Sequence, residues 1–394
     1  MATGMSGTRI RKELSKHIPG HRLTQSDAFR LVTVQPDNPQ ELHTIVGFAA
    51  REGVPVVPAA HATRPPVMED WHIRLNFGRM SAIVDFSLES GLVCAQAGTK
   101  LADLSDWLME KGHSLMVRPD YGEDMELWEF LLAPDAGNFG PRFGSKWEQV
   151  FSLSAVLPSG RIFENSLAPA RASGPDFSRI ILAGRGAFGL PLEVYLKVRP
   201  LPRRRQLTAL AILDLPEACA RAWKVAEAAQ PEFMEIVANQ CRSGDKVPAQ
   251  FALIELWGER TEVARRKELV RKHFGKSAKT TDVPYEELLG LEETCRFERG
   301  ARSQYFTDRQ GLAELIDSVG QGPVADAPQL RLRGFVHNQA YVTIERPAGS
   351  PPRPTTTQDL FTSTDGSWLL QETSRHLDPR GIFSWAPRVW DEVG

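Results

Sequence analysis

The sequence predicts an α+β fold made of a larger N-terminal unit and a smaller C-terminal one. Strands and helices alternate up to Pro200, and the elements beyond Pro202 follow a different rhythm. We therefore expect a helical extension over 1–30, the larger unit over 31–202, the smaller unit over 203–345, and a mobile loop with a C-terminal segment that returns to the larger unit over 346–394.

The elements of the larger unit are predicted from apolar spacing and from residues that begin or end helices. A helix capped by Asp37 carries an apolar stripe at helical spacing, formed by Leu42, Ile45, Val46 and Ala49. Thr99 is the expected N-cap of a second helix, over 100–111. The other elements expected here are strands at 54–57, 82–86, 92–96, 150–157, 161–163 and 192–198 and a helix at 176–182.

The smaller unit is predicted to be a ferredoxin-like α/β domain, with an antiparallel sheet covered by helices on one face. Its expected strands are 207–213, 251–257, 329–335 and 340–345, and its expected helices are 216–229, 259–274 and 311–319. The run Arg203-Arg204-Arg205 before it is interpreted either as an anion-binding cluster or as a solvated hinge. A last helix is expected near 367–377.

Composition and charge narrow the classes of function. The 47 Lys and Arg residues balance 49 Asp and Glu residues, which argues against binding to nucleic acid or to a membrane surface. The four cysteines include no C-x-x-C pair, so the chain is expected to hold no iron–sulfur cluster or zinc of its own. No apolar run is long enough to span a bilayer. We expect a cytoplasmic protein, with the basic N-terminus as a surface helix or, alternatively, a mitochondrial leader.

A series of short motifs follows in order between Leu31 and Pro202. The motifs are 34–42 (VQPDNPQEL), 53–57 (GVPVV), 94–98 (CAQAG), 121–123 (YGE), 143–145 (FGS), 155–160 (AVLPSG), 176–179 (DFSR) and 184–189 (GRGAFG). In order and spacing they resemble the FAD-binding domain of the vanillyl-alcohol oxidase type, also called PCMH-type, which has two α/β subdomains. Within that family, 176–184 and the closing motif at 377–383 are most similar to the small FAD-binding subunit of bacterial glycolate oxidase.

The resemblance implies FAD as the cofactor. Backbone N–H groups hold the FAD pyrophosphate where the chain can approach it closely, and close approach favours glycine. The positions that the resemblance implies as cofactor-binding are Pro58, Ala59, Ala60, His61, Ala62, Thr63, Gly98, Tyr121, Gly140, Ser145, Gly184, Gly186 and Gly189.

The family has three loops that approach the phosphates, and this chain keeps them unequally. The third loop, 184–189, keeps its glycines, which fit either cofactor contact or a tight turn without a ligand. The first loop, 58–66, has no glycine, and its His61 is interpreted either as a covalent flavin link or as a surface histidine. In the second loop the chain has Leu127-Trp-Glu-Phe130, where the Glu129 carboxylate would repel a pyrophosphate.

A family member that acts on 2-hydroxy acids also needs a group that takes the hydroxyl proton and an Arg that binds the carboxylate. The candidates in this chain are His337 and Arg333, and Arg333 shares a strand face with Arg331 by the period of two. The alternative is a turn histidine beside a solvated strand face. No second histidine stands at ligand spacing, so no metal is predicted.

Two main functions follow from the resemblance. The first is an FAD-linked oxidoreductase subunit that oxidises a small 2-hydroxy acid such as glycolate or lactate. Its expected partners are a larger FAD subunit and an iron–sulfur subunit, with oxygen or quinone as the alternative electron acceptor. The second is a subunit with the same fold but weak or lost FAD binding, which stabilises a multi-subunit oxidase. A third reading is a flavin oxidase of a secondary metabolite or a sugar.

Overall fold

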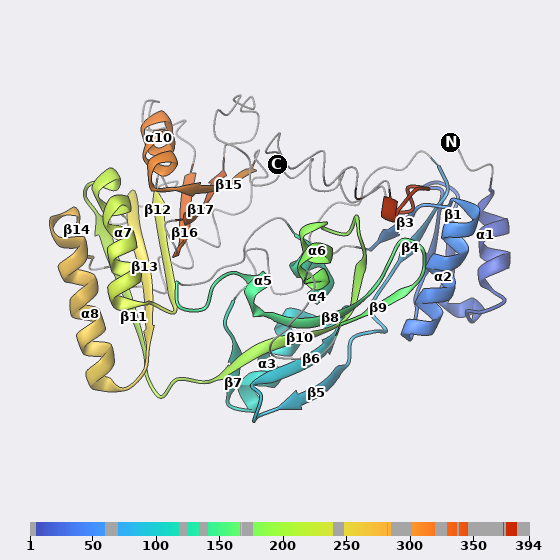
Figure 1. Ribbon diagram of the computed structural model, residues 1–394, viewed down its shortest axis with the longest axis horizontal. Coiled ribbons are helices and arrows are strands. Elements are labelled where there is room, and N and C mark those ends of the chain that lie inside the picture. The colour runs from blue at the N-terminus through green and yellow to red at the C-terminus, as the bar shows by residue number, and fades with distance from the viewer. Residues whose placement is uncertain are drawn as a thin grey trace.

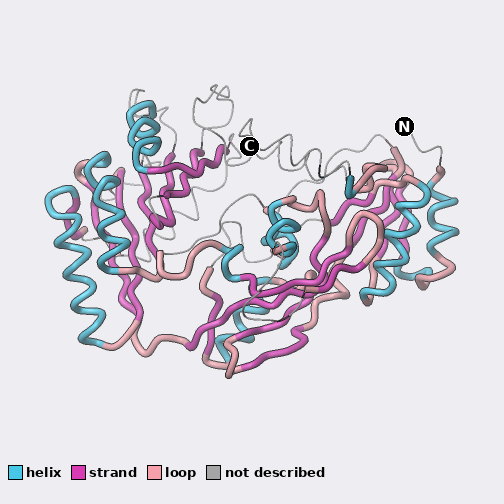
Figure 2. Tube along the Cα trace, in the orientation of Figure 1, coloured by secondary structure: helices cyan, strands magenta, loops and turns pink. Residues whose placement is uncertain are grey.

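The structure, a computed structural model, describes residues 5–59, 70–117, 125–133, 141–165, 167, 176–238, 248–281, 283–284, 302–319, 329–336, 339–345, 373 and 376–383. Within these ranges the strands form three β-sheets. The molecule is elongated, with the N-terminal sheets at one end and the C-terminal sheet at the other (Figure 1). Figure 2 shows the same division, with the strands of the second sheet running between the two ends. The predicted sites at 60–63, 121, 140 and 337 and the predicted loop at 346–357 lie outside the described residues.

The first sheet has four strands in the order β1-β2-β4-β3. Strands β2, β4 and β3 are parallel, and β1 pairs antiparallel with β2, so the sheet begins within the N-terminal extension. The elements are α1 (Gly7–Leu14), η1 (Gly20–Arg22), β1 (Leu23–Ser26), β2 (Leu31–Val34), α2 (Pro39–Glu52), β3 (Val56–Pro58) and β4 (His72–Leu75).

Two helix starts differ by one residue from those predicted. Asn38 rather than Asp37 caps α2, because Asn38 has extended backbone and its side chain accepts from the amide of Glu41 at 2.9 Å. The Asp37 amide instead donates to the Glu41 carboxylate at 2.8 Å. Lys100 rather than Thr99 is the N-cap of α3, and its side chain makes no capping hydrogen bond.

The second sheet is antiparallel, in the order β5-β6-β10-β8-β9, with β7 also paired to β10. One apolar core joins it to the first sheet, since Val32 of β2, Val93 of β6 and Phe383 pack in the same cluster. The amide of Val56 donates to the carbonyl of Ile382 at 2.8 Å, which brings 376–383 against the first sheet. The elements are β5 (Ile83–Ser87), β6 (Leu92–Gln96), α3 (Leu101–Glu110), β7 (His113–Leu115), α4 (Leu127–Leu132), α5 (Lys146–Gln149), β8 (Val150–Val156), β9 (Ile162–Glu164), α6 (Phe177–Ala183) and β10 (Leu190–Pro200).

The third sheet belongs to the smaller unit and is antiparallel, in the order β14-β11-β13-β12-β16-β17-β15. Ile236 and Ile254 on one face pack with residues of α7, α8 and α10, so the prediction of helices on one face is confirmed. Strand β12 was not predicted. The elements are β11 (Arg205–Ile212), α7 (Leu215–Ala229), β12 (Phe233–Ala238), β13 (Gln250–Trp257), α8 (Arg260–Phe274), η2 (Gly275–Ser277), β14 (Ala278–Thr280), β15 (Arg302–Asp308), α10 (Arg309–Val319), β16 (Gln329–Val336) and β17 (Gln339–Glu345).

Candidate functional site

The third predicted phosphate-approaching loop, 184–189, forms a tight turn between α6 and β10. Arg185 and Gly186 have positive φ angles of 48° and 92°, which is the left-handed region that favours glycine. A Cβ atom on Gly184 would lie 2.4 Å from the ring of Phe188, so this glycine also lets the ring pack against the turn. The turn therefore has the shape expected of a phosphate-approaching loop, and its first glycine has a packing role as well.

Gly98, another predicted cofactor-binding position, lies where two chain segments cross closely. A Cβ atom there would lie 2.1 Å from the carbonyl oxygen of Phe77, which is a backbone atom. The Gly98 amide donates to the carbonyl of Met80 at 2.9 Å. Close packing of the chain by itself thus requires glycine at this position.

The second predicted loop is a helix, α4, rather than an open loop. Its six residues, from Leu127 to Leu132, are all buried. The amides of Leu127 and Trp128 donate to the carbonyls of Thr99 and Ala97, each at 2.9 Å. The Glu129 side chain is fully buried within the protein, which differs from the expectation that it faces the pyrophosphate. Two N–H groups that could have met a phosphate are therefore bonded within the chain.

Lys146 ties the C-terminal end of α4 to the start of α5. Its buried ammonium group donates to the carbonyl of Phe130 and, at 2.8 Å, to the carbonyl of Ala133. It also lies 5.0 Å from the centre of the Phe130 ring. A cation at a helix C-terminus satisfies carbonyls that the helix leaves unbonded. Sequence reasoning missed Lys146, and its only signal was its place directly after the FGS motif at 143–145.

The remaining predicted cofactor positions are divided between the two N-terminal sheets. Ser145 is the N-cap of α5, where its hydroxyl donates to Glu148 at 2.9 Å in a capping box. Pro58 ends β3, and the Ala59 amide beyond it donates to the carbonyl of Leu75 at 2.6 Å. The structure brings α4 beside α6, and so places the second segment near the third turn (Figure 1).

The predicted substrate arginines lie in β16 of the third sheet. Position 333 is opposite Glu235 of β12, and position 331 is opposite Val237. Val237 belongs to a small apolar cluster on the face of the sheet away from the helices. Helices α7 and α8 lie on the outer side of this sheet, and the opposite face is turned toward the N-terminal sheets (Figure 1). We call it the inner face.

The inner face carries buried charge. Glu235 and Glu255 are both fully buried, although carboxylates are seldom buried without partners. Glu255 accepts from the Arg205 guanidinium, with the Nη2–Oε2 distance at 2.8 Å, and from the indole N–H of Trp257. The inner face therefore holds two buried carboxylates, and that of Glu255 is paired with Arg205.

Two features are absent from the described part of the chain. There, no group of three or more His, Cys, Asp or Glu side chains is placed to hold a metal ion. Among the same residues, no helix combines the length and the apolar character needed to cross a membrane.

The comparisons with known proteins agree with this architecture. Residues 31–166 match the family model described as "FAD binding domain". The chain is 25% identical to a mitochondrial D-lactate dehydrogenase [cytochrome] of Arabidopsis thaliana over 189 residues, which is 47% of this chain but only 32% of that relative's length. A structure of alkyldihydroxyacetonephosphate synthase has a TM-score of 0.73 at 14% identity and covers 96% of this chain and 84% of its own. A structure of p-cresol methylhydroxylase has a TM-score of 0.69 at 11% identity, and the match covers 100% of this chain and 87% of that structure's chain.

These findings define the fold and the N-terminal domain. Residues 31–166 form an FAD-binding domain, and the chain as a whole has the fold of the PCMH-type flavoproteins. FAD is accordingly the cofactor of this domain.

The described residues fit FAD in part. The turn at 184–189 keeps the left-handed backbone expected beside a phosphate. Helix α4 does not fit, because its residues are buried and the amides of Leu127 and Trp128 are bonded to carbonyls of the chain. In the third turn the amides of Arg185 and Ala187 also donate to carbonyls of the chain, so the fit of this turn to a phosphate rests on its left-handed backbone. The second segment serves the packing of the domain.

Proposed function

We propose that the protein is an FAD-linked oxidoreductase, or the FAD-binding subunit of one, that oxidises a small 2-hydroxy acid such as glycolate or lactate. The observation that carries the proposal is an FAD-binding domain at 31–166 joined to a sheet whose inner face is turned toward it (Figure 1). The similarity to a D-lactate dehydrogenase supports a 2-hydroxy acid as the substrate class.

The proposed substrate chemistry assigns separate roles to residues of the smaller unit. Oxidation of a 2-hydroxy acid to the 2-oxo acid removes two electrons and two protons, and the chemistry that FAD supplies when bound is acceptance of the electron pair. In this proposal Arg333 binds the substrate carboxylate and His337 takes the hydroxyl proton. Position 333 stands opposite the buried Glu235, on a strand that helps to form the inner face.

The electrons must then leave the chain, since its four cysteines contain no C-x-x-C pair that would hold a cluster. A partner iron–sulfur subunit, with a larger FAD subunit, or a soluble acceptor such as oxygen or quinone completes the proposed reaction.

Visible absorption tests this proposal directly. We expect the purified protein to carry flavin or to take it up from added FAD, and glycolate or D-lactate to bleach the flavin absorption without oxygen. Arg333→Gln should raise the substrate concentration needed for bleaching at least about tenfold, because a charge-assisted hydrogen bond is lost. Arg203→Gln, in the linker, is the matched control. A flavin-loaded protein that no 2-hydroxy acid bleaches would overturn the substrate assignment.

The burial of α4 favours a second candidate function. If the third turn alone cannot hold FAD, the chain acts as a structural subunit of a larger oxidase. The matching result is a colourless protein that takes up no FAD and co-purifies with a larger flavoprotein and an iron–sulfur protein. That result would overturn the enzymatic proposal.

A further inference from the structure

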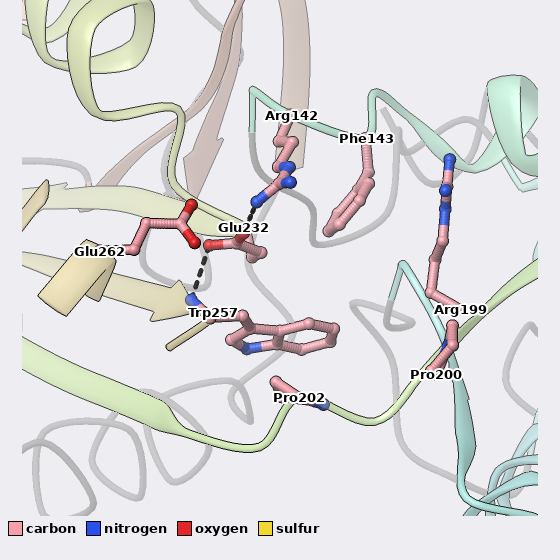
Figure 3. A pocket seen from close by; sticks show the side chains of 9 residues that line it. Arg142, Phe143, Arg199, Pro200, Pro202, Glu232, Trp257 and Glu262 are labelled. Carbon is pink, nitrogen blue, oxygen red and sulfur yellow. Dashed lines mark hydrogen bonds and ion pairs between the residues drawn. The ribbon is translucent and has the colours of Figure 1, made fainter. Parts of the chain in front are cut away.

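A pocket lies at the junction of the two units, and it is lined by none of the residues assigned above to FAD or to the 2-hydroxy acid. Its volume is about 350 Å³. The N-terminal unit contributes the loop before α5 and the end of β10, and the smaller unit contributes the residue before β12, the end of β13 and the start of α8 (Figure 3). The lining residues used below are Arg142, Phe143, Arg199, Glu232, Trp257 and Glu262.

The carboxylate of Glu232 is already neutralised. It accepts from Arg142 at 2.5 Å, from Arg266 at 2.8 Å and from the backbone amide of Trp257 at 2.9 Å. Because Glu232 is buried and has these three donors, it offers little to a cationic ligand.

The charged side chains that line the pocket balance, but they are not equally paired. The guanidinium groups of Arg142 and Arg199 and the carboxylates of Glu232 and Glu262 line it, and Arg266, outside the lining, pairs with both carboxylates. Arg142 and Arg266 are ion-paired, whereas Arg199 is exposed and forms no ion pair with the described residues. Figure 3 shows the Arg199 side chain standing at the edge of the pocket, opposite Arg142 across Phe143. An anionic group that enters the pocket therefore meets an available guanidinium.

The walls of the pocket are flat and aromatic. The rings of Phe143 and Trp257 lie 6.1 Å apart between centroids at an interplanar angle of 54°, with Pro202 beneath the indole (Figure 3). The indole is held in place by its hydrogen bond to the buried Glu255. Aromatic rings bind other aromatic rings in tilted or offset geometries, beyond the burial of area alone. The volume lies at the lower end of the range of about 300–1,000 Å³ that is typical of ligand pockets.

We propose that this pocket binds a small aromatic carboxylate of one or two rings. The ring packs against Trp257 and Phe143, and the carboxylate pairs with Arg199. Since Phe143 and Arg199 belong to one unit and Trp257 to the other, a bound ligand stabilises the observed arrangement of the two units by linkage. The site is thus a regulatory or second-ligand site at the junction, separate from the proposed oxidation.

Calorimetric titration of the full chain tests the ligand chemistry with four matched probes. Benzoate should bind, while benzamide, which keeps the ring but has no charge, and acetate, which keeps the charge but has no ring, should each bind at least about tenfold more weakly. Benzyltrimethylammonium tests the opposite charge. Equal binding of benzoate and benzamide, tighter binding of the cation, or no binding of benzoate would overturn the proposal.

Two variants tie the binding to this pocket. Arg199→Gln should weaken benzoate binding at least about tenfold, because the charged hydrogen bond is lost. Arg203→Gln is the control, since Arg203 is a highly exposed linker residue that does not line the pocket. Both side chains are exposed, so both variants should keep the circular dichroism and unfolding midpoint of the wild type. Equal effects of the two variants on benzoate affinity would also overturn the proposal.

Discussion

The segment 127–132 and the turn 184–189 lie beside each other in the N-terminal unit, yet their backbones have opposite character. The turn has left-handed residues and glycines, and it leads directly into the central strand β10. The segment is a buried helix whose first amides are bonded to carbonyls of the chain. The comparison teaches that two segments predicted to approach a phosphate differ, since one is closed by the packing of the domain and the other keeps a left-handed turn.

The largest expected effect on stability comes from replacing Lys146, which holds the C-terminal end of the buried helix α4. Lys146→Met removes the ammonium group from the carbonyls of Phe130 and Ala133 and leaves both buried acceptors without that donor. We expect a loss of about 3 kcal/mol in the free energy of unfolding, measured with urea. Lys111→Met, an exposed lysine whose ammonium lies 5.5 Å from the Trp107 ring, is the control and should cost less than about 1 kcal/mol. Similar losses in both variants would contradict the role given to Lys146.

The next effect separates packing from cofactor contact in the turn. Gly184→Ala places a methyl group against the Phe188 ring and should cost about 2 kcal/mol of stability. Adding Phe188→Leu should recover most of that stability, because the smaller side chain can make room. If the turn holds the pyrophosphate, the double variant will still take up FAD more weakly than the wild type. Full recovery of FAD uptake would show that Gly184 serves packing alone.

A third variant distinguishes the buried helix seen in the structure from the repulsion between Glu129 and the pyrophosphate that the sequence predicts. If the Glu129 carboxylate faced the pyrophosphate, Glu129→Gly would strengthen FAD uptake. The structure predicts the opposite, since Glu129 is buried within α4 and glycine costs about 1 kcal/mol in a helix. We expect lower stability and no gain in FAD affinity, measured by unfolding and by flavin titration. A clear gain in affinity would mean that the segment opens in solution.

The smallest effect concerns pH and the strand β4, which begins just after the first loop. Burial lowers the pKa of His72 from its ordinary value of 6.5. Between that lowered pKa and 6.5 the unfolded chain binds a proton that the folded chain does not, so stability falls as the pH falls through this window. His72→Asn should flatten this part of the stability profile, measured by urea unfolding at several pH values. An unchanged slope would show that other groups cause it.

Much of the fold could be predicted because its signals are local. The apolar stripe of α2 lies at the predicted positions Leu42, Ile45, Val46 and Ala49, all buried in the structure. The helix-covered antiparallel sheet followed in the same way from the periods of its strands and helices. By contrast, β12 was missed although all six of its residues are buried, because a short apolar run has no period that distinguishes a strand from a helix.

For the candidate site, the sequence predicted which residue types take part but not how they are arranged in space. The glycines of the third turn and the period-two spacing of Arg331 and Arg333 are visible in the sequence, and the strand register puts these arginines opposite Val237 and Glu235. The pocket at the junction had no such signal, since Arg142, Arg199 and Trp257 are far apart in the chain.

The sequence by itself determined the order of elements, the resemblance to a flavin domain, and the unequal glycine content of its loops, because these depend on residue type and spacing alone. Tertiary structure decided what the altered positions do. Glycine is required at position 98 because the backbone of Phe77 approaches it closely. The C-terminal end of α4 is held by the Lys146 ammonium group, which donates to the carbonyl of Ala133. These outcomes depend on contacts between distant segments, whose free energies no local pattern encodes.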